Sequence, residues 1–127
     1  MSEFVPDLRS IAQHAGPFPP QAVAFIREGL AHTVKMLHGD ADADEERRHV
    51  NGQQLCLGLR DYALKQYGRL ARTVLKSWNI TTTEDFGKIV FAMIEAELMR
   101  KTEQDSMDDF RAVYDFDEAF GDVSFSR

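Results

Sequence analysis

Residues 78–90, WNITTTEDFGKIV, decide the fold that this sequence predicts. A helix ends at the tryptophan and a polar turn follows. Thr82, with Asp85 three residues later, has the spacing of a capping box that starts a new helix. From Phe86 onward apolar residues follow at helical spacing on more than one side, so we expect this helix to be the central one. Two helices joined by a short turn have the shape of a helix-turn-helix, which raises the question of DNA binding.

Helical spacing of apolar residues predicts three further helices before this stretch. They cover residues 4–15, residues 19–39 after a Pro-Pro start, and residues 51–67. Asn51 is expected to be the N-cap of the last of these, with Gln54 three residues on as in a capping box. The loop over residues 40–48 is too polar to bury, and residues 49–50 form a possible short extended segment.

A shorter helix between Gly68 and the opening stretch is expected to carry Leu70, Val74 and Trp78 inward. After the central helix, residues 98–103 and 110–116 are expected to pair as a hairpin. The sequence therefore predicts a single domain that is mainly α with a small β-hairpin. Its expected parts are N-terminal helices over 1–39, the acidic loop over 40–48, a winged-helix-like part over 49–120 and a tail over 121–127.

Bulk composition fits one globular domain inside a cell. The chain has 127 residues, of which 43% are hydrophobic and 28% charged. Its longest apolar run, residues 89–94, is too short to cross a bilayer, and its N-terminus lacks the pattern of a secretory signal. A single cysteine, Cys56, cannot form an internal disulfide. We therefore expect a cytoplasmic protein without a membrane segment.

The net charge of −6 is divided into three blocks. Residues 1–46 carry 3 basic and 8 acidic groups, a net charge of −5. Residues 47–78 carry 7 basic groups and 1 acidic group, a net charge of +6. Residues 79–127 carry 5 basic and 12 acidic groups, a net charge of −7. A basic block between acidic ones attracts an outside polyanion or its own flanks. Neutralisation within the chain is the simpler interpretation, because it needs no partner.

Charge also answers the question of DNA binding. A recognition helix needs cations against phosphates and base-reading side chains in its first turn. The corresponding positions here are Thr83, Glu84, Asp85 and Lys88, two of them carboxylates, and the expected hairpin tip holds three aspartates. The element has the shape of a DNA reader and the wrong surface for one, so we do not expect nucleic acid as the partner.

Two sets of residues are candidates for binding a protein partner. Lys65, Arg69, Arg72 and Lys76, here called the basic stripe, share one helix face if Gly68 does not break the helix. The acidic C-terminal segment contributes the rings of Tyr114, Phe116 and Phe120. The alternatives stay open at this point: the stripe is a solvated face balanced by the acidic C-terminal half, and the rings pack into the core.

The sequence offers no metal or cofactor site. Asp40, Asp42 and Asp44 alternate as at the start of a calcium loop, but Glu45 replaces the required Gly and Asn51 the bidentate Glu. The four histidines lack the spacing that zinc hydrolases use, and no Gly-rich phosphate loop is present.

No residue is assigned a catalytic role, although His49, directly before the N-cap of a helix, would suit a cleft. A structural hydrogen bond is the alternative for His49. Cys56 lies between two leucines and is interpreted as a small core residue.

Five stretches together resemble a family of small conserved hypothetical proteins from planctomycetes, verrucomicrobia and related bacteria. They are HVNGQQL, ARTVLKSWNI, TTEDFGKIVFAMIE, KTEQDSMDDF and YDFDEAF, and the resemblance spans about residues 20–120. The chain departs from the family pattern mildly, with Asn51 for Ser, Tyr67 for Phe and Asn79 for Gly. The resemblance implies a cytoplasmic bacterial protein of unassigned function, and it supplies no catalytic residue.

Three hypotheses of function follow. The favoured one is a non-catalytic module that binds a protein partner not identified by the sequence. The second is a winged-helix-like regulator associated with nucleic acid, and the third is an enzyme with a site near His49. A homodimer is also open, because the first two helices offer a leucine- and valine-rich face that a second copy could cover.

Overall fold

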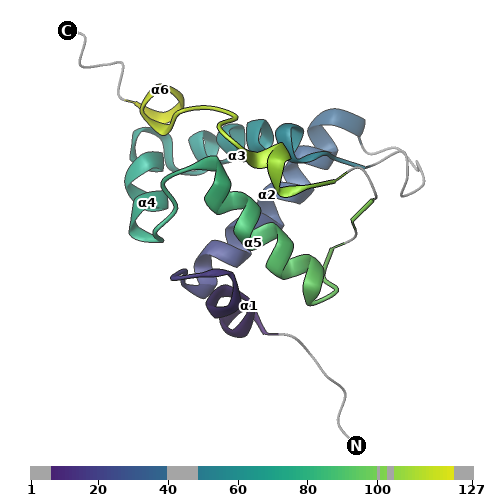
Figure 1. Cartoon of the computed structure of the whole chain (residues 1–127). Coiled ribbons are helices and arrows are strands. Elements are labelled where there is room, and N and C mark those ends of the chain that lie inside the picture. Colours follow the sequence, from purple (N-terminus) through teal and green to yellow (C-terminus); the bar gives the residue numbers. More distant parts are fainter. Residues whose placement is uncertain (1–6, 40–48, 100, 103–104, 122–127) are drawn as a thin grey trace, which may run out of the picture.

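The structure is a computed structural model that describes residues 7–39, 49–99, 101–102 and 105–121. Within these ranges it is mainly helical, as expected, and no helix there is both long and apolar enough to span a bilayer (Figure 1). The start of the first expected helix and the acidic loop over residues 40–48 lie outside the described residues.

Six α-helices and two 3₁₀ turns make up the described part of the chain. They are α1 (Leu8–Ala15), α2 (Pro20–His38), α3 (Gly52–Tyr67), η1 (Gly68–Leu70), α4 (Ala71–Ser77), α5 (Thr83–Glu95), η2 (Met107–Phe110) and α6 (Phe116–Phe120). The capping boxes expected from the sequence are confirmed: Asn51 with Gln54 starts α3, and Thr82 with Asp85 starts α5.

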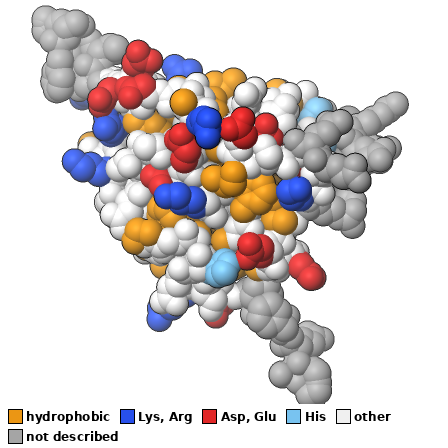
Figure 2. Space-filling view, in the orientation of Figure 1, with side chains coloured by type: hydrophobic (Ala, Val, Ile, Leu, Met, Phe, Trp, Pro, Cys, Tyr) orange, Lys and Arg blue, Asp and Glu red, His pale blue; other side chains and the backbone are white. Residues whose placement is uncertain are grey.

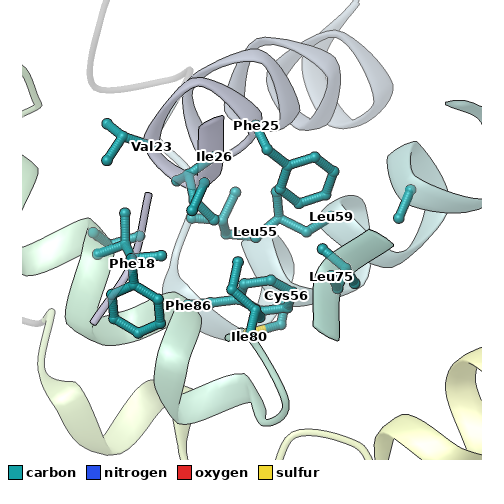
Figure 3. Close-up of a cluster of buried hydrophobic side chains, with 14 of the residues drawn as sticks. Phe18, Val23, Phe25, Ile26, Leu55, Cys56, Leu59, Leu75, Ile80 and Phe86 are labelled. Carbon is teal, nitrogen blue, oxygen red and sulfur yellow. The ribbon is translucent and has the colours of Figure 1, made fainter. Parts of the chain in front are cut away.

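α5 is the central helix, which confirms the expectation drawn from its apolar spacing. It contacts α1, α2, α3 and η2, and Figure 1 shows it crossing in front of α2. The side chains of Phe86, Ile89 and Met93 are fully buried. Figure 3 shows Phe86 among side chains from α2, α3 and α4, so residues far apart in the sequence share one core.

α2 and α3 pack closely against each other. A Cβ placed on Gly58 of α3 would come closer than 3.0 Å to the side chain of Thr33 on α2. Thr33 is fully buried and satisfies its hydroxyl by donating a hydrogen bond to the carbonyl of Gly29, 2.7 Å away. Glycine at position 58 therefore sets the distance between the two helices, because only a residue without a side chain fits there.

The expected β-hairpin is wrong. No strand occurs in the part of the chain that the structure describes. The 3₁₀ turn η2 lies in the expected hairpin tip, residues 111–115 have no helix or strand, and α6 begins at the last residue of the expected second arm. Ser106 and Asp109 form a capping box at η2, and the carboxylate of Asp115 accepts a hydrogen bond from the backbone N–H of Glu118 at α6. These caps favour helical turns over extended pairing. Residues 49–50, the possible extended segment, also have no regular secondary structure.

The expected inward face of the short helix is wrong at Leu70, whereas Trp78 packs against the core as expected. Leu70 is 63% exposed, whereas Ala71 and Leu75 are buried, and Val74 and Trp78 are half-buried. The 3₁₀ turn of η1 changes the phase between α3 and α4, because it advances fewer residues per turn than an α-helix.

Candidate protein-interaction surface

Gly68 divides the basic stripe between two helices. Its φ of 55° lies in the left-handed region, and its N–H bonds back to the carbonyl of Leu64, which ends α3. Lys65 therefore lies on α3, whereas Arg69 lies in η1 and Arg72 and Lys76 lie on α4. The condition that all four share one continuous helix is not met.

Two of the four cations have acidic partners within the chain. Lys65 Nζ lies 3.5 Å from Asp61 Oδ2 on the same helix. Arg72 of α4 forms an ion pair with Asp117 of α6, which joins the basic block to the acidic C-terminal segment. In Figure 2 acidic side chains beside α6 and basic side chains beside α4 are neighbours at the upper left. Carboxylates of the chain itself thus pair with two of the four cations of the basic stripe.

The other two cations, Arg69 and Lys76, are exposed and make no ion pair with any described residue. Arg69 lies in the 3₁₀ turn that leads into α4, and Lys76 lies in the last turn of α4. Leu70 directly follows Arg69 in the chain, and at 63% exposed it is the most exposed large hydrophobic side chain described. We call Arg69, Leu70 and Lys76 the basic patch. No Asp or Glu occurs between residues 62 and 83, so the patch has no acidic neighbour along the chain.

The C-terminal rings lie in the core. Phe116 and Phe120 are buried, and Phe116 packs against Phe86 of the central helix with ring centroids 5.6 Å apart. The hydroxyl of Tyr114 donates a hydrogen bond to the carbonyl of Cys56, 2.7 Å away, and burial raises the pKa of that hydroxyl. The three rings therefore match the alternative interpretation, in which they pack into the core. A partner could contact them only if α6 moved away from the core.

The first turn of α5 makes contacts within the molecule at the positions where a recognition helix would read bases. The hydroxyl of Thr83 donates to the carbonyl of Phe110 at 2.7 Å, and Glu84 accepts from the N–H of Ala112 at 3.2 Å. Asp85 accepts from the N–H of Thr81 at 2.9 Å. Thr83 and Glu84 thus hold the end of η2 and the segment after it, a role that sequence reasoning missed, whereas Asp85 holds the turn before α5 as part of the expected capping box.

His49 contacts a carboxylate. Its Nε2 lies 3.1 Å from Oδ1 of Asp105, and its backbone carbonyl accepts a hydrogen bond from Nε2 of His38, also at 3.1 Å. Asp105 in turn accepts from the N–H of Thr102 through Oδ2. The pair ties the start of α3 to the segment before η2, and in the described residues no cluster of His, Cys, Asp and Glu has the arrangement of a metal site.

Cys56 is fully buried, which confirms its interpretation as a core residue. Burial raises the pKa of its thiol to about 12. At neutral pH the side chain is therefore the thiol, which is a poor nucleophile.

Comparisons with protein-family models, curated proteins and solved structures found no match. The resemblance to the planctomycete and verrucomicrobial family stays a prediction.

Proposed function

We propose that this chain is a non-catalytic protein-interaction module that binds an acidic segment of its partner through the basic patch. Arg69 and Lys76 would face carboxylates of that segment, and Leu70 would contact an apolar side chain between them. Binding through exposed charges and a single leucine predicts a salt-sensitive complex of modest affinity.

The observation that carries the proposal is the contrast within the basic stripe. Lys65 and Arg72 are neutralised by Asp61 and Asp117, whereas Arg69 and Lys76 are left without a carboxylate among the described residues. Exposed cations beside an exposed leucine fit a partner that brings both acidic and apolar groups. The proposal places the protein in the cytoplasm, where a single buried cysteine stays reduced.

The test is affinity purification of the tagged full chain from its native lysate, with and without nuclease, read by mass spectrometry. A double charge reversal, R69E with K76E, is compared with R27E and K35E, which reverses two exposed cations on α2. We expect a nuclease-resistant partner with the wild type and the α2 control, and its loss with the R69E and K76E variant. Equal capture by both variants would overturn the proposal.

A nucleic-acid regulator is the second candidate, since α4, the turn and α5 keep the order of a helix-turn-helix, and free cations also suit phosphates. Partners that vanish with nuclease would support it. An enzyme is the third candidate, supported by the His49–Asp105 pair. It would require a substrate whose turnover is lost in H49Q while the melting temperature is kept.

A further inference from the structure

The outer face of α3 carries two leucines that the core does not use. Leu57 is 51% exposed and Leu64 is 37% exposed, whereas Leu55 and Leu59 of the same helix are buried. Because Leu57 and Leu64 are seven residues apart, they lie on the same side of the helix. This face is separate from the basic patch, which lies on η1 and α4.

Two opposite charges lie between these leucines. Arg60 is exposed and makes no ion pair with a described residue. Asp61 contacts His32 at 2.7 Å and Lys65 at 3.5 Å, and both contacts are made to its Oδ2 atom. The Oδ1 atom of Asp61 makes no hydrogen bond or ion pair within the described part of the chain.

The spacing of these residues is symmetric about the midpoint between Arg60 and Asp61. The segment is Leu57-x-x-Arg60-Asp61-x-x-Leu64, with apolar ends and two complementary charges at its centre. When two identical helices pair antiparallel about a two-fold axis, each position meets its mirror position in the segment. With the axis between Arg60 and Asp61, Leu57 lies opposite the second copy's Leu64, and Arg60 lies opposite the second copy's Asp61.

We propose that two copies of this chain form a symmetric dimer by antiparallel packing of their α3 helices on this axis. Charge complementarity selects a second copy as the occupant, because the same four residues supply both sides of every contact. A foreign helix would also cover the leucines, but it would not require the segment to be symmetric. The proposal is independent of the proposed function.

Met36 of α2 extends the apolar part of this surface. The contact between His32 and Asp61 fixes the register of α2 against α3. Because the two helices run in opposite directions, Met36 and Leu57 each lie one turn from that contact toward the same end. Met36 is 49% exposed. The apolar area is still small, so we expect an interface near the lower size limit of stable complexes and association in the micromolar range.

The first test measures the oligomeric state of the full chain by sedimentation velocity over about 1 to about 500 micromolar protein. We expect a shift from monomer to dimer as the concentration rises. L57D should weaken association at least about tenfold, because it places a carboxylate in the apolar contact. L98D is the matched control, since Leu98 is an exposed leucine outside both α3 and the basic patch, and it should associate as the wild type does. A wild type that stays monomeric, or equal effects of both variants, would overturn the proposal.

A charge swap tests the antiparallel register. In an R60E homodimer, each charged pair between the two copies would consist of two acids. In a D61R homodimer, each such pair would consist of two arginines. Each variant alone should therefore dimerise less than the wild type. Mixed together they restore two opposite-charge pairs, and a heterodimer should form more tightly than either homodimer. A mixture no tighter than the separate variants would rule out this register. R60E keeps the described contacts of Asp61, so it remains informative if D61R is poorly folded.

Discussion

At the scale of single residues, the burial of Cys56 determines its chemistry. The side chain is fully buried on α3, and its pKa is raised to about 12 by loss of solvation. Only the thiolate attacks disulfide reagents. At pH 8 the thiolate would be roughly one part in ten thousand, as the difference of about four pH units requires.

We therefore expect the native protein not to react with an aromatic disulfide reagent at pH 8, and to react with one equivalent in denaturant. Q53C provides the control, because Gln53 is an exposed residue of the same helix and its thiol should react promptly in the native state. Prompt reaction of Cys56 in the wild type would mean that the core around α3 opens easily.

At the scale of elements, α6 allows the contribution of a buried ring to stability to be compared with that of a surface ion pair. Phe116 is buried against Phe86 and Phe120, with ring centroids 5.6 Å and 5.0 Å away. Asp117, the next residue, is 77% exposed and pairs with Arg72. F116A should lower the free energy of unfolding by about 3–5 kcal/mol. D117A should lower it by less than about 1 kcal/mol, because an exposed ion pair is screened by solvent.

Urea unfolding followed by circular dichroism compares the two variants. If F116A unfolds at the same urea concentration as the wild type, the ring does not stabilise the core. The acidic C-terminal segment would then again be a candidate for docking to a partner.

Elements set by local signals could be predicted from the sequence. Asn51 with Gln54 and Thr82 with Asp85 located two helix starts, since a cap depends on residues three positions apart. The direction in which Leu70 points could not be predicted, because it depends on the 3₁₀ turn that follows Gly68. The hairpin error arose because alternating acids and rings in the C-terminal segment match a strand pattern, while Asp115 caps a helix there.

The candidate site was predicted only as a set of charges. The sequence identified four cations, but Arg72 and Asp117 are 45 residues apart, and their contact depends on where α6 packs. The free pair, Arg69 and Lys76, could be distinguished only once the internal partners of the other two were known. Similarly, the charges in the first turn of α5 could be read from the sequence and argued against DNA binding. The hydrogen bonds from that turn to the segment after η2 could be recognised only once the fold was known.

At the scale of the whole molecule, contacts between histidines and carboxylates join elements that are distant in the sequence. His14 of α1 contacts Glu95 of α5, and His32 of α2 contacts Asp61 of α3. The hydrogen bond from His32 holds the pKa of Asp61 below its usual value of 3.8, and the charge of Lys65 acts in the same direction. The stability of the molecule is therefore linked to the ionisation of Asp61.

The sign of this linkage follows from the lowered pKa. The folded state favours the ionised Asp61, so its contribution is fully present above pH 3.8 and is lost as the pH falls through the lower pKa of the folded state. Its size is limited to about 1 kcal/mol, because the side chain is 41% exposed. D61N should thus be less stable than the wild type at pH 7, and the difference should shrink as the pH is lowered below 3.8.

Urea unfolding at a series of pH values from about 7 to about 3 measures this difference, at protein concentrations below about 1 micromolar so that dimerisation does not contribute. D108N is the control, because Asp108 is an exposed carboxylate whose described ion pair is with Arg111, three positions away in the sequence. Its stability should follow that of the wild type at every pH. If the difference between D61N and the wild type stayed constant down to the lowest pH, the amide would be acting on packing between α2 and α3 and not through the charge of Asp61.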